Sequence, residues 1–128
     1  ACTDVTGFSL LGHAFEIAEK SGVGLRVSAA SVPLLPGAEH YAADGHQPGG
    51  LGRNRSYFAR HPRGGVTIDA TVRSDLSALL FGPETSGGLL LTVPVDQSAR
   101  FEASFAETGY PLWHIGEVVD GVGIEVTP

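Results

Sequence analysis

The residues best suited to chemistry lie in the first thirteen positions, which read A-C-T-D-V-T-G-F-S-L-L-G-H. Asp4 stands in a polar turn, residues 3–7, that leads into an apolar segment. We expect a helix to begin there, and the first backbone N–H groups of a helix lack partners and favour negative charge. An aspartate at that place has two interpretations: an N-cap, or a carboxylate presented to a metal ion or a metal–phosphate complex. The turn alone does not choose between them.

A second distinctive stretch joins a hydroxyl-rich, glycine-rich loop to an apolar run. Thr85, Ser86, Gly87 and Gly88 precede residues 89–93, which are apolar except for Thr92. The apolar run predicts a buried central strand. The loop is either an ordinary turn or a functional one. In the functional case it contacts an oxyanion or phosphate, or its backbone is held tightly against the Asp4 turn.

Residues 45–56 form a third candidate, rich in glycine and basic residues. Successive backbone N–H groups in such a loop can bind an anion, with Arg53 or Arg55 as the charged partner. The alternative is a solvated loop, since the stretch matches neither the Walker A nor the Rossmann pattern.

The composition limits the class of protein. The chain has 128 residues, 42% of them hydrophobic and 17% charged, with a net charge of −6. These values predict one globular domain and argue against a nucleic-acid binder, which needs clustered Lys and Arg. The single cysteine, Cys2, excludes an internal disulfide and is expected to be a small buried hydrophobic residue. No apolar run approaches a membrane span and no signal-peptide pattern occurs, so we expect a cytoplasmic protein without membrane contact.

The periodicity predicts alternating helices and strands. The apolar spacing favours a helix that begins near Thr6 and ends at Gly22, with His13 on its partly exposed side. Asp96 is expected to cap a later helix, and Asp120-Gly121 to form a hairpin turn. Trp113 and His114 are expected to be packing residues. The expected helices are 6–21, 38–43, 53–60, 72–80 and 96–108, and the expected strands are 23–27, 66–69, 89–93, 112–119 and 123–126. This order predicts an α+β fold, a mixed β-sheet with helices packed on it.

Together, three blocks resemble the C-terminal domain of selenophosphate synthetase (selenide, water dikinase), in the superfamily of aminoimidazole ribonucleotide synthetase. The blocks are T-D-V-T-G-F with L-L-G-H, P-G-G with R-N, and P-E-T-S-G-G-L-L, in order over essentially the whole chain. The chain departs from the family pattern at three positions. The family usually has Gly where this chain has Ser9, Asp where it has Gly82, and Gln where it has Glu84.

The resemblance implies an enzyme that converts ATP, selenide and water to selenophosphate, AMP and phosphate. It implies that residues 1–128 are a single C-terminal domain, that the ATP-binding N-terminal domain with the reactive Cys or selenocysteine is absent, and that no catalytic residue lies in this chain. Asp4 would be a ligand of the Mg²⁺ ions that bridge the ATP phosphates. Thr85, Ser86, Gly87 and Gly88, and then Arg53 and Asn54, are the further candidates for binding the cofactor. The absence of an initiator Met agrees with an excised domain, and we expect the isolated domain to be inactive.

The resemblance also implies a homodimer of the full-length protein. Two alternatives stay open. One is another enzyme of the superfamily, such as a purine-biosynthesis synthetase or a thiamine-monophosphate kinase. The other is a non-enzymatic assembly module.

Overall fold

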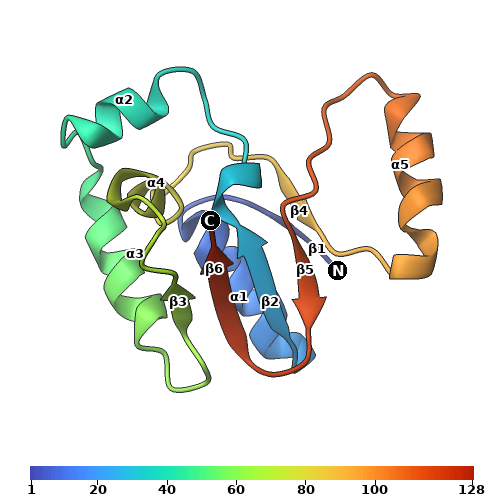
Figure 1. Ribbon diagram of the computed structural model, residues 1–128, viewed down its shortest axis with the longest axis horizontal. Helices are drawn as coiled ribbons and strands as arrows, with labels where there is room; N and C mark the ends of the chain where they lie inside the picture. Colours follow the sequence, from blue (N-terminus) through green and yellow to red (C-terminus); the bar gives the residue numbers. More distant parts are fainter.

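The computed structural model describes residues 1–128 and consists of two β-sheets, with helices beside the larger sheet and behind it (Figure 1). No helix combines the length and the apolar character needed to cross a membrane. The strands are β1 (Cys2–Asp4), β2 (Gly24–Ser28), β3 (Val66–Ile68), β4 (Leu89–Leu91), β5 (Gly116–Val119) and β6 (Gly123–Thr127), and the helices are α1 (Ser9–Ser21), α2 (Ala38–Ala43), α3 (Gly49–Ala59), α4 (Ser74–Leu79) and α5 (Ser98–Ala106), with short 3-10 helices at Ala29–Ser31 and Val95–Gln97.

The larger sheet has four strands in the order β3-β6-β2-β5. Strand β2 is parallel to β6 and antiparallel to β5, so the sheet is mixed and the predicted α+β class is confirmed. The predicted hairpin at Asp120-Gly121 is wrong. Gly24 of β2 pairs with Val119 on one side and with Gly123 on the other, so β2 lies between β5 and β6. The turn therefore carries the chain across the end of β2.

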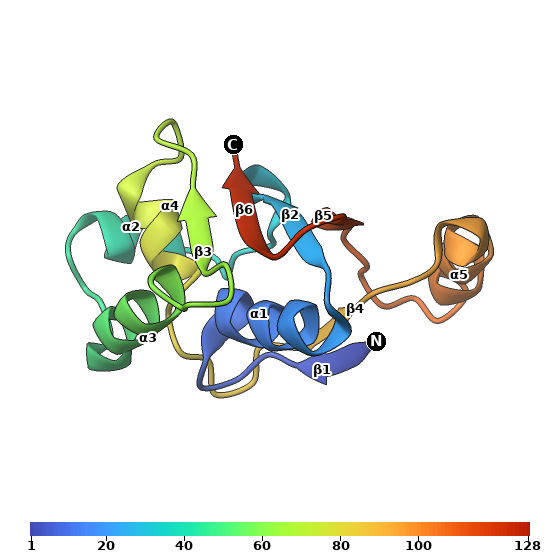
Figure 2. The same ribbon diagram turned by 90° about the horizontal axis from the view of Figure 1, so that it is seen from below.

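Helix α1 covers one face of this sheet (Figure 2). Its apolar positions recur at helical spacing, and burying a large side chain such as Phe15 contributes about 1.5–3 kcal/mol. The core combines this face with the inward side chains of the sheet: Leu11, Ala14, Phe15, Ala18, Leu25, Val27, Ile124 and Val126.

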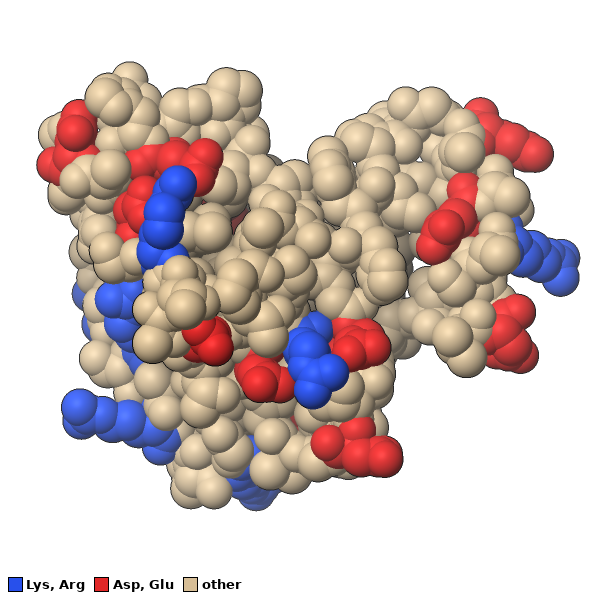
Figure 3. Space-filling model, in the orientation of Figure 1, with Lys and Arg blue, Asp and Glu red and all other residues tan.

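The other face of the sheet is open and polar. Arg26 contacts Glu125 at 3.0 Å and Glu117 at 2.8 Å, and these two carboxylates raise the pKa of its guanidinium. Figure 3 shows scattered acidic and basic side chains over this face.

Helix α1 begins later than predicted, at Ser9, and the cap position is Phe8 without any side-chain cap bond. The Asp4 N-cap interpretation is therefore wrong, because Asp4 lies in β1. The predicted end is confirmed: Gly22 has φ 68°, the left-handed geometry that favours glycine. Ser9 also has a positive φ of 67° and is the only non-glycine residue that does. The usual family glycine at this position thus has a conformational reason.

Strand β4 pairs only with β1 and forms a separate two-stranded sheet. Leu89 is 69% exposed, so the prediction of a buried central strand is wrong. Cys2, on the paired strand, is exposed and not the buried residue we expected. An apolar run in the sequence indicates that other parts of a protein cover the strand, but it does not identify the covering segment.

Helix α5 stands apart from the rest of the molecule, and none of its residues is buried (Figures 1 and 2). Phe101 and Phe105 lie one turn apart on it, with ring centroids 5.7 Å from each other. Asp96 falls in the 3-10 helix before α5 and makes no side-chain cap bond, so its predicted capping role is wrong. Trp113 is 52% exposed, contrary to the predicted packing role.

Candidate functional site

The turn at residues 5–7 is bonded to the loop at residues 84–88 by three backbone hydrogen bonds. The N–H of Val5 donates to the carbonyl of Gly88 at 2.9 Å, and the N–H of Gly87 donates back to the carbonyl of Val5 at 3.0 Å. The N–H of Glu84 donates to the carbonyl of Thr6 at 3.0 Å. The P-E-T-S-G-G-L-L block is therefore held against the T-D-V-T-G-F block, which confirms the predicted close backbone approach.

Both glycines of that loop have a steric reason. A Cβ on Gly87 would lie 2.7 Å from the carbonyl oxygen of Val5, well inside van der Waals contact. Gly88 has φ 89°, a conformation that other residues rarely adopt. The pair lets the loop turn tightly into β4, where Leu89 pairs with Asp4. Thr85 and Ser86, in the same loop, are exposed.

Asn54, in the P-G-G with R-N block, connects that block to the same turn. Its side-chain amide nitrogen donates to the carbonyl of Gly7 at 3.0 Å and to the carbonyl of Phe81 at 3.1 Å. The residue is buried on α3. Both amide hydrogens are thus used inside the protein, and Asn54 joins its own block to the turn at Gly7 and to the segment just before the loop at residues 84–88.

The glycine-rich segment itself is different from our expectation. Helix α3 starts at Gly49, four residues before the predicted start at residue 53. Residues 49–52 are therefore helical, and the prediction of a loop with an anion nest there is wrong. Pro48, just before the helix, has an extended conformation, and Leu51 and Phe58 are buried on the inner side of α3. Packing of these two side chains outweighs the low helix propensity of glycine.

Asp4 ends β1 with an exposed side chain, beside the turn that all three blocks support. No group of three or more His, Cys, Asp or Glu side chains lies close enough together to hold a metal ion. Mg²⁺ commonly takes only one or two protein carboxylates and completes its shell with phosphate oxygens and waters. The Asp4 carboxylate fits that role as one ligand of a shared site.

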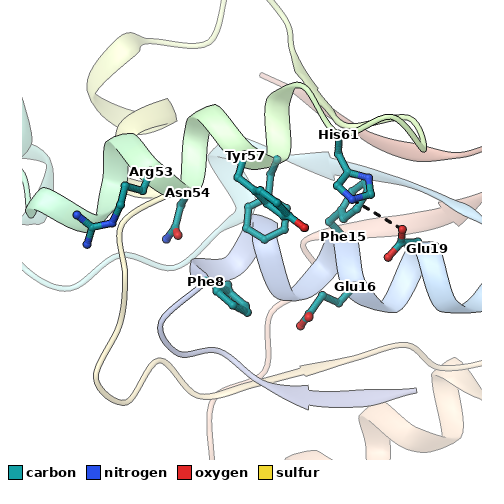
Figure 4. Close-up of a pocket in the computed structure, with 9 residues that line it drawn as sticks. Phe8, Phe15, Glu16, Glu19, Arg53, Asn54, Tyr57 and His61 are labelled. Carbon is teal, nitrogen blue, oxygen red and sulfur yellow. Dashed lines mark ion pairs between the residues drawn. The ribbon is translucent and has the colours of Figure 1, made fainter.

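A groove of about 430 Å³ lies between α1 and α3 (Figure 4). Arg53 is at one end of it, and Glu19 with His61 at the other, 3.9 Å apart. Arg53 is exposed and makes no ion pair, so its guanidinium is free to meet an anion. The floor and walls are mainly aromatic, with Phe8, Phe15, Tyr57 and Phe58 among the lining residues.

The sequence did not reveal a contact between the turn and α1. The hydroxyl of Thr6 lies 3.0 Å from Nε2 of His13, and Nδ1 of His13 lies 3.4 Å from Glu16. Thr6 and His13 are seven residues apart and in different elements. The only available signal was the i,i+3 spacing of His13 and Glu16, which places them on one helix face.

Comparison with known proteins agrees with this architecture. The family described as AIR synthase related protein, C-terminal domain, matches residues 1–127. Selenide, water dikinase of Bordetella bronchiseptica is 50% identical over 120 residues, which cover 93% of this chain and 33% of that protein. The enzyme of the same name from Pseudomonas putida is 45% identical over 120 residues, 94% of this chain and 33% of its own length. The chain thus spans about a third of the length of these relatives.

Solved structures show the same fold at lower identity. A thiamine-monophosphate kinase from Stenotrophomonas maltophilia has a TM-score of 0.60 at 22% identity, over 98% of this chain and 30% of that one. The protein tt0281 from Thermus thermophilus has a TM-score of 0.63 at 23% identity, over 98% of this chain and 31% of that one. The match over residues 1–127 shows that the chain belongs to the family of AIR synthase related C-terminal domains.

Proposed function

We propose that this chain is the C-terminal domain of an ATP-dependent selenophosphate synthetase. One observation carries the proposal: the three blocks shared with that family meet at the turn beside Asp4, in a chain 50% identical to a selenide, water dikinase. The full-length enzyme would convert selenide, ATP and water to selenophosphate, AMP and phosphate. The rest of the enzyme, an N-terminal domain, would supply the nucleophile and the remaining metal ligands.

In this proposal the domain forms one wall of a shared site. Asp4 is the Mg²⁺ ligand, and the metal, when bound, neutralises charge that develops on the phosphates during transfer. The loop at residues 85–88 offers two hydroxyls and a close backbone beside it. Arg53 supplies a free guanidinium for a phosphate oxygen, since it has no ion-pair partner within the domain. Asn54 acts on the same site by holding Gly7 in place.

The remaining features of the proposal follow from the family resemblance. The full-length protein would be a cytoplasmic homodimer, and its partners would be small molecules, without nucleic acid or membrane. The domain alone would be inactive, because a single carboxylate is a poor Mg²⁺ site and the nucleophile lies elsewhere.

The test uses the full-length protein and measures selenide-dependent formation of AMP from ATP at several Mg²⁺ concentrations. Asp4→Asn should lower kcat/KM at least 100-fold and raise the Mg²⁺ requirement. Asp44→Asn, an exposed aspartate at the end of α2, is the matched control and should leave both unchanged. Full activity of the Asp4→Asn protein would contradict the ligand assignment.

The thiamine-monophosphate kinase structures favour one second candidate, a small-molecule kinase of the same fold. The assay distinguishes the two when thiamine monophosphate replaces selenide and ADP is measured as well as AMP, because transfer of a single phosphoryl group from ATP leaves ADP. Turnover with thiamine monophosphate but not with selenide would favour the kinase. A full-length protein that consumes no ATP with either compound would indicate a non-enzymatic assembly module instead.

A further inference from the structure

Thr6, His13 and Glu16 form a hydroxyl–imidazole–carboxylate line at the candidate site. The hydroxyl oxygen of Thr6 lies 3.0 Å from Nε2 of His13, and a Glu16 carboxylate oxygen lies 3.4 Å from Nδ1. The side chain of His13 is only 11% exposed, and the ring of Phe8 lies 5.5 Å from it, centroid to centroid. Both ring nitrogens therefore have a polar neighbour, and the imidazole is held in one orientation.

The carboxylate determines how the hydroxyl is used. A carboxylate beside Nδ1 favours the imidazole tautomer with its proton on that nitrogen. Nε2 is then an acceptor, and the Thr6 hydroxyl must donate its single proton to it. With its only proton donated to His13, the Thr6 hydroxyl can take part in further hydrogen bonds only as an acceptor.

Thr6 is also fixed through its backbone. Its carbonyl oxygen accepts from the N–H of Ser9 at 2.9 Å and from the N–H of Glu84 at 3.0 Å. Thr6 is two residues from Asp4 in the chain, and these bonds fix its backbone in the turn that follows β1. An acceptor at this place suits the protons of a water molecule and repels the oxygens of a phosphate.

We infer that His13 is a positioning residue that makes the Thr6 hydroxyl an acceptor for metal-bound water beside Asp4. This inference rests on the proposed function. It assigns Thr6 to the water shell of the metal and leaves phosphate contacts to Arg53 and the loop at residues 85–88.

Charged groups on the elements around His13 are few. Glu16 stands next to it on α1, and Asp4 belongs to the strand that leads to Thr6. On the α3 side, Arg53 and His61 line the groove that Glu16 also lines, where His61 is beside Glu19.

The test uses full-length protein with Thr6→Val, His13→Gln, both together, and Thr6→Ser. Three quantities are measured: the ¹⁵N shifts of the His13 ring, the affinity for Mn²⁺ in the presence of ATP by electron paramagnetic resonance, and kcat/KM at neutral pH. Melting temperatures establish that each variant folds.

We expect Thr6→Val and His13→Gln each to weaken Mn²⁺ affinity and lower kcat/KM about tenfold, a loss typical of an outer-shell contact. The double variant should lose no more than either single one, because the two residues act through one bond. Thr6→Ser should stay within about twofold of the original protein, since it keeps the hydroxyl. Thr6→Val should shift the Nε2 resonance of His13.

Two control variants separate this role from general effects. His40→Gln removes an exposed histidine that has Asp44 one turn away, and Thr67→Val removes a hydroxyl that bonds to the Ile124 carbonyl in the sheet. Both should leave Mn²⁺ affinity unchanged. Additive losses in the double variant, or a Thr6→Val protein with unchanged His13 shifts and Mn²⁺ affinity, would overturn the inference. If selenide-dependent turnover is absent from every protein, the proposed function fails, and the ¹⁵N shifts and Mn²⁺ affinities still decide the role of His13.

Discussion

The side-chain amide of Asn54 lies 3.0 Å from the carbonyl oxygen of Gly7, although the two residues are 47 positions apart. The same amide reaches the carbonyl of Phe81 at 3.1 Å. One buried side chain on α3 therefore ties the turn beside Asp4 to the segment that leads into the loop at residues 84–88. Asn54 thus helps to assemble the candidate site from segments that are distant in the sequence.

We predict that Asn54→Ala destabilises the protein by about 2 kcal/mol, because two carbonyl groups lose their donor in a buried place. Thermal and urea unfolding measure the change. Arg53→Ala is the matched control on the same helix, and since Arg53 is exposed and unpaired, its effect on stability should stay within about 0.5 kcal/mol. Equal stability losses in the two variants would contradict the bridging role of Asn54.

Gly87→Ala should also destabilise the protein, by about 1–3 kcal/mol, because the new Cβ would meet the Val5 carbonyl and force the loop away from the turn. Gly52→Ala is the comparison. A Cβ on Gly52 would have no atom within 4 Å, and the residue lies inside α3. That change should stabilise the protein by about 0.5–1 kcal/mol through helix propensity. A Gly87→Ala protein as stable as the original would show that the loop has room that the backbone contacts do not indicate.

Much of the fold followed from local patterns. The bounds of α2, the Gly22 end of α1 and the positions of β2 and β3 were predicted from periodicity and turn residues, which report local geometry. The α+β class followed from the same element order.

The failures concern relations between distant segments. A turn signal at Asp120-Gly121 does not say that β2 lies between the strands it joins. The glycines of α3 are weak helix formers, and only the burial of Leu51 and Phe58 explains their conformation. The contact of Thr6 with His13 needs the turn to fold back on the first helix. In each case tertiary packing overrides the local preference.

Ser9 offers a test of backbone strain beside the site. A left-handed non-glycine residue costs roughly 1–2 kcal/mol, and the buried Ser9 hydroxyl offsets part of this by donating to the Leu80 carbonyl. That bond is 2.7 Å long. Ser9→Gly loses the bond but removes the strain, so its stability should stay within about 0.5 kcal/mol of the original. Ser9→Ala loses the bond and keeps the strain, so it should be less stable than Ser9→Gly by about 1 kcal/mol or more.

Urea unfolding of the two Ser9 variants decides the point. The carbonyl of Leu80 keeps a donor in both, since the N–H of Leu11 reaches it at 3.3 Å. Neither variant therefore leaves the Leu80 carbonyl without a hydrogen-bond donor, so the stability difference between them reports the backbone strain at position 9. If Ser9→Ala proves the more stable of the two, the positive φ at this position carries no cost.

The last prediction concerns the turn after β3, where the Thr71 hydroxyl lies 2.6 Å and its N–H nitrogen 2.8 Å from one Asp69 oxygen. The hydroxyl bond and then the backbone bond lower the pKa of Asp69 below its usual 3.8. A lowered pKa in the folded protein adds stability above the unfolded pKa, and this stability is lost as pH falls through the folded value.

Thr71→Val removes the larger cause of the lowered pKa, so it should raise the pKa of Asp69, as measured by NMR titration of the carboxyl carbon. Its melting temperature should fall below that of the original protein at neutral pH, and the difference should narrow as the pH falls below 3.8, the usual pKa of the carboxyl group. Thr67→Val, whose hydroxyl bonds to an uncharged carbonyl, should show a gap that does not change with pH. A Thr71→Val deficit that is equally large at both pH values would show that the hydroxyl supports the turn by packing and not through the Asp69 charge.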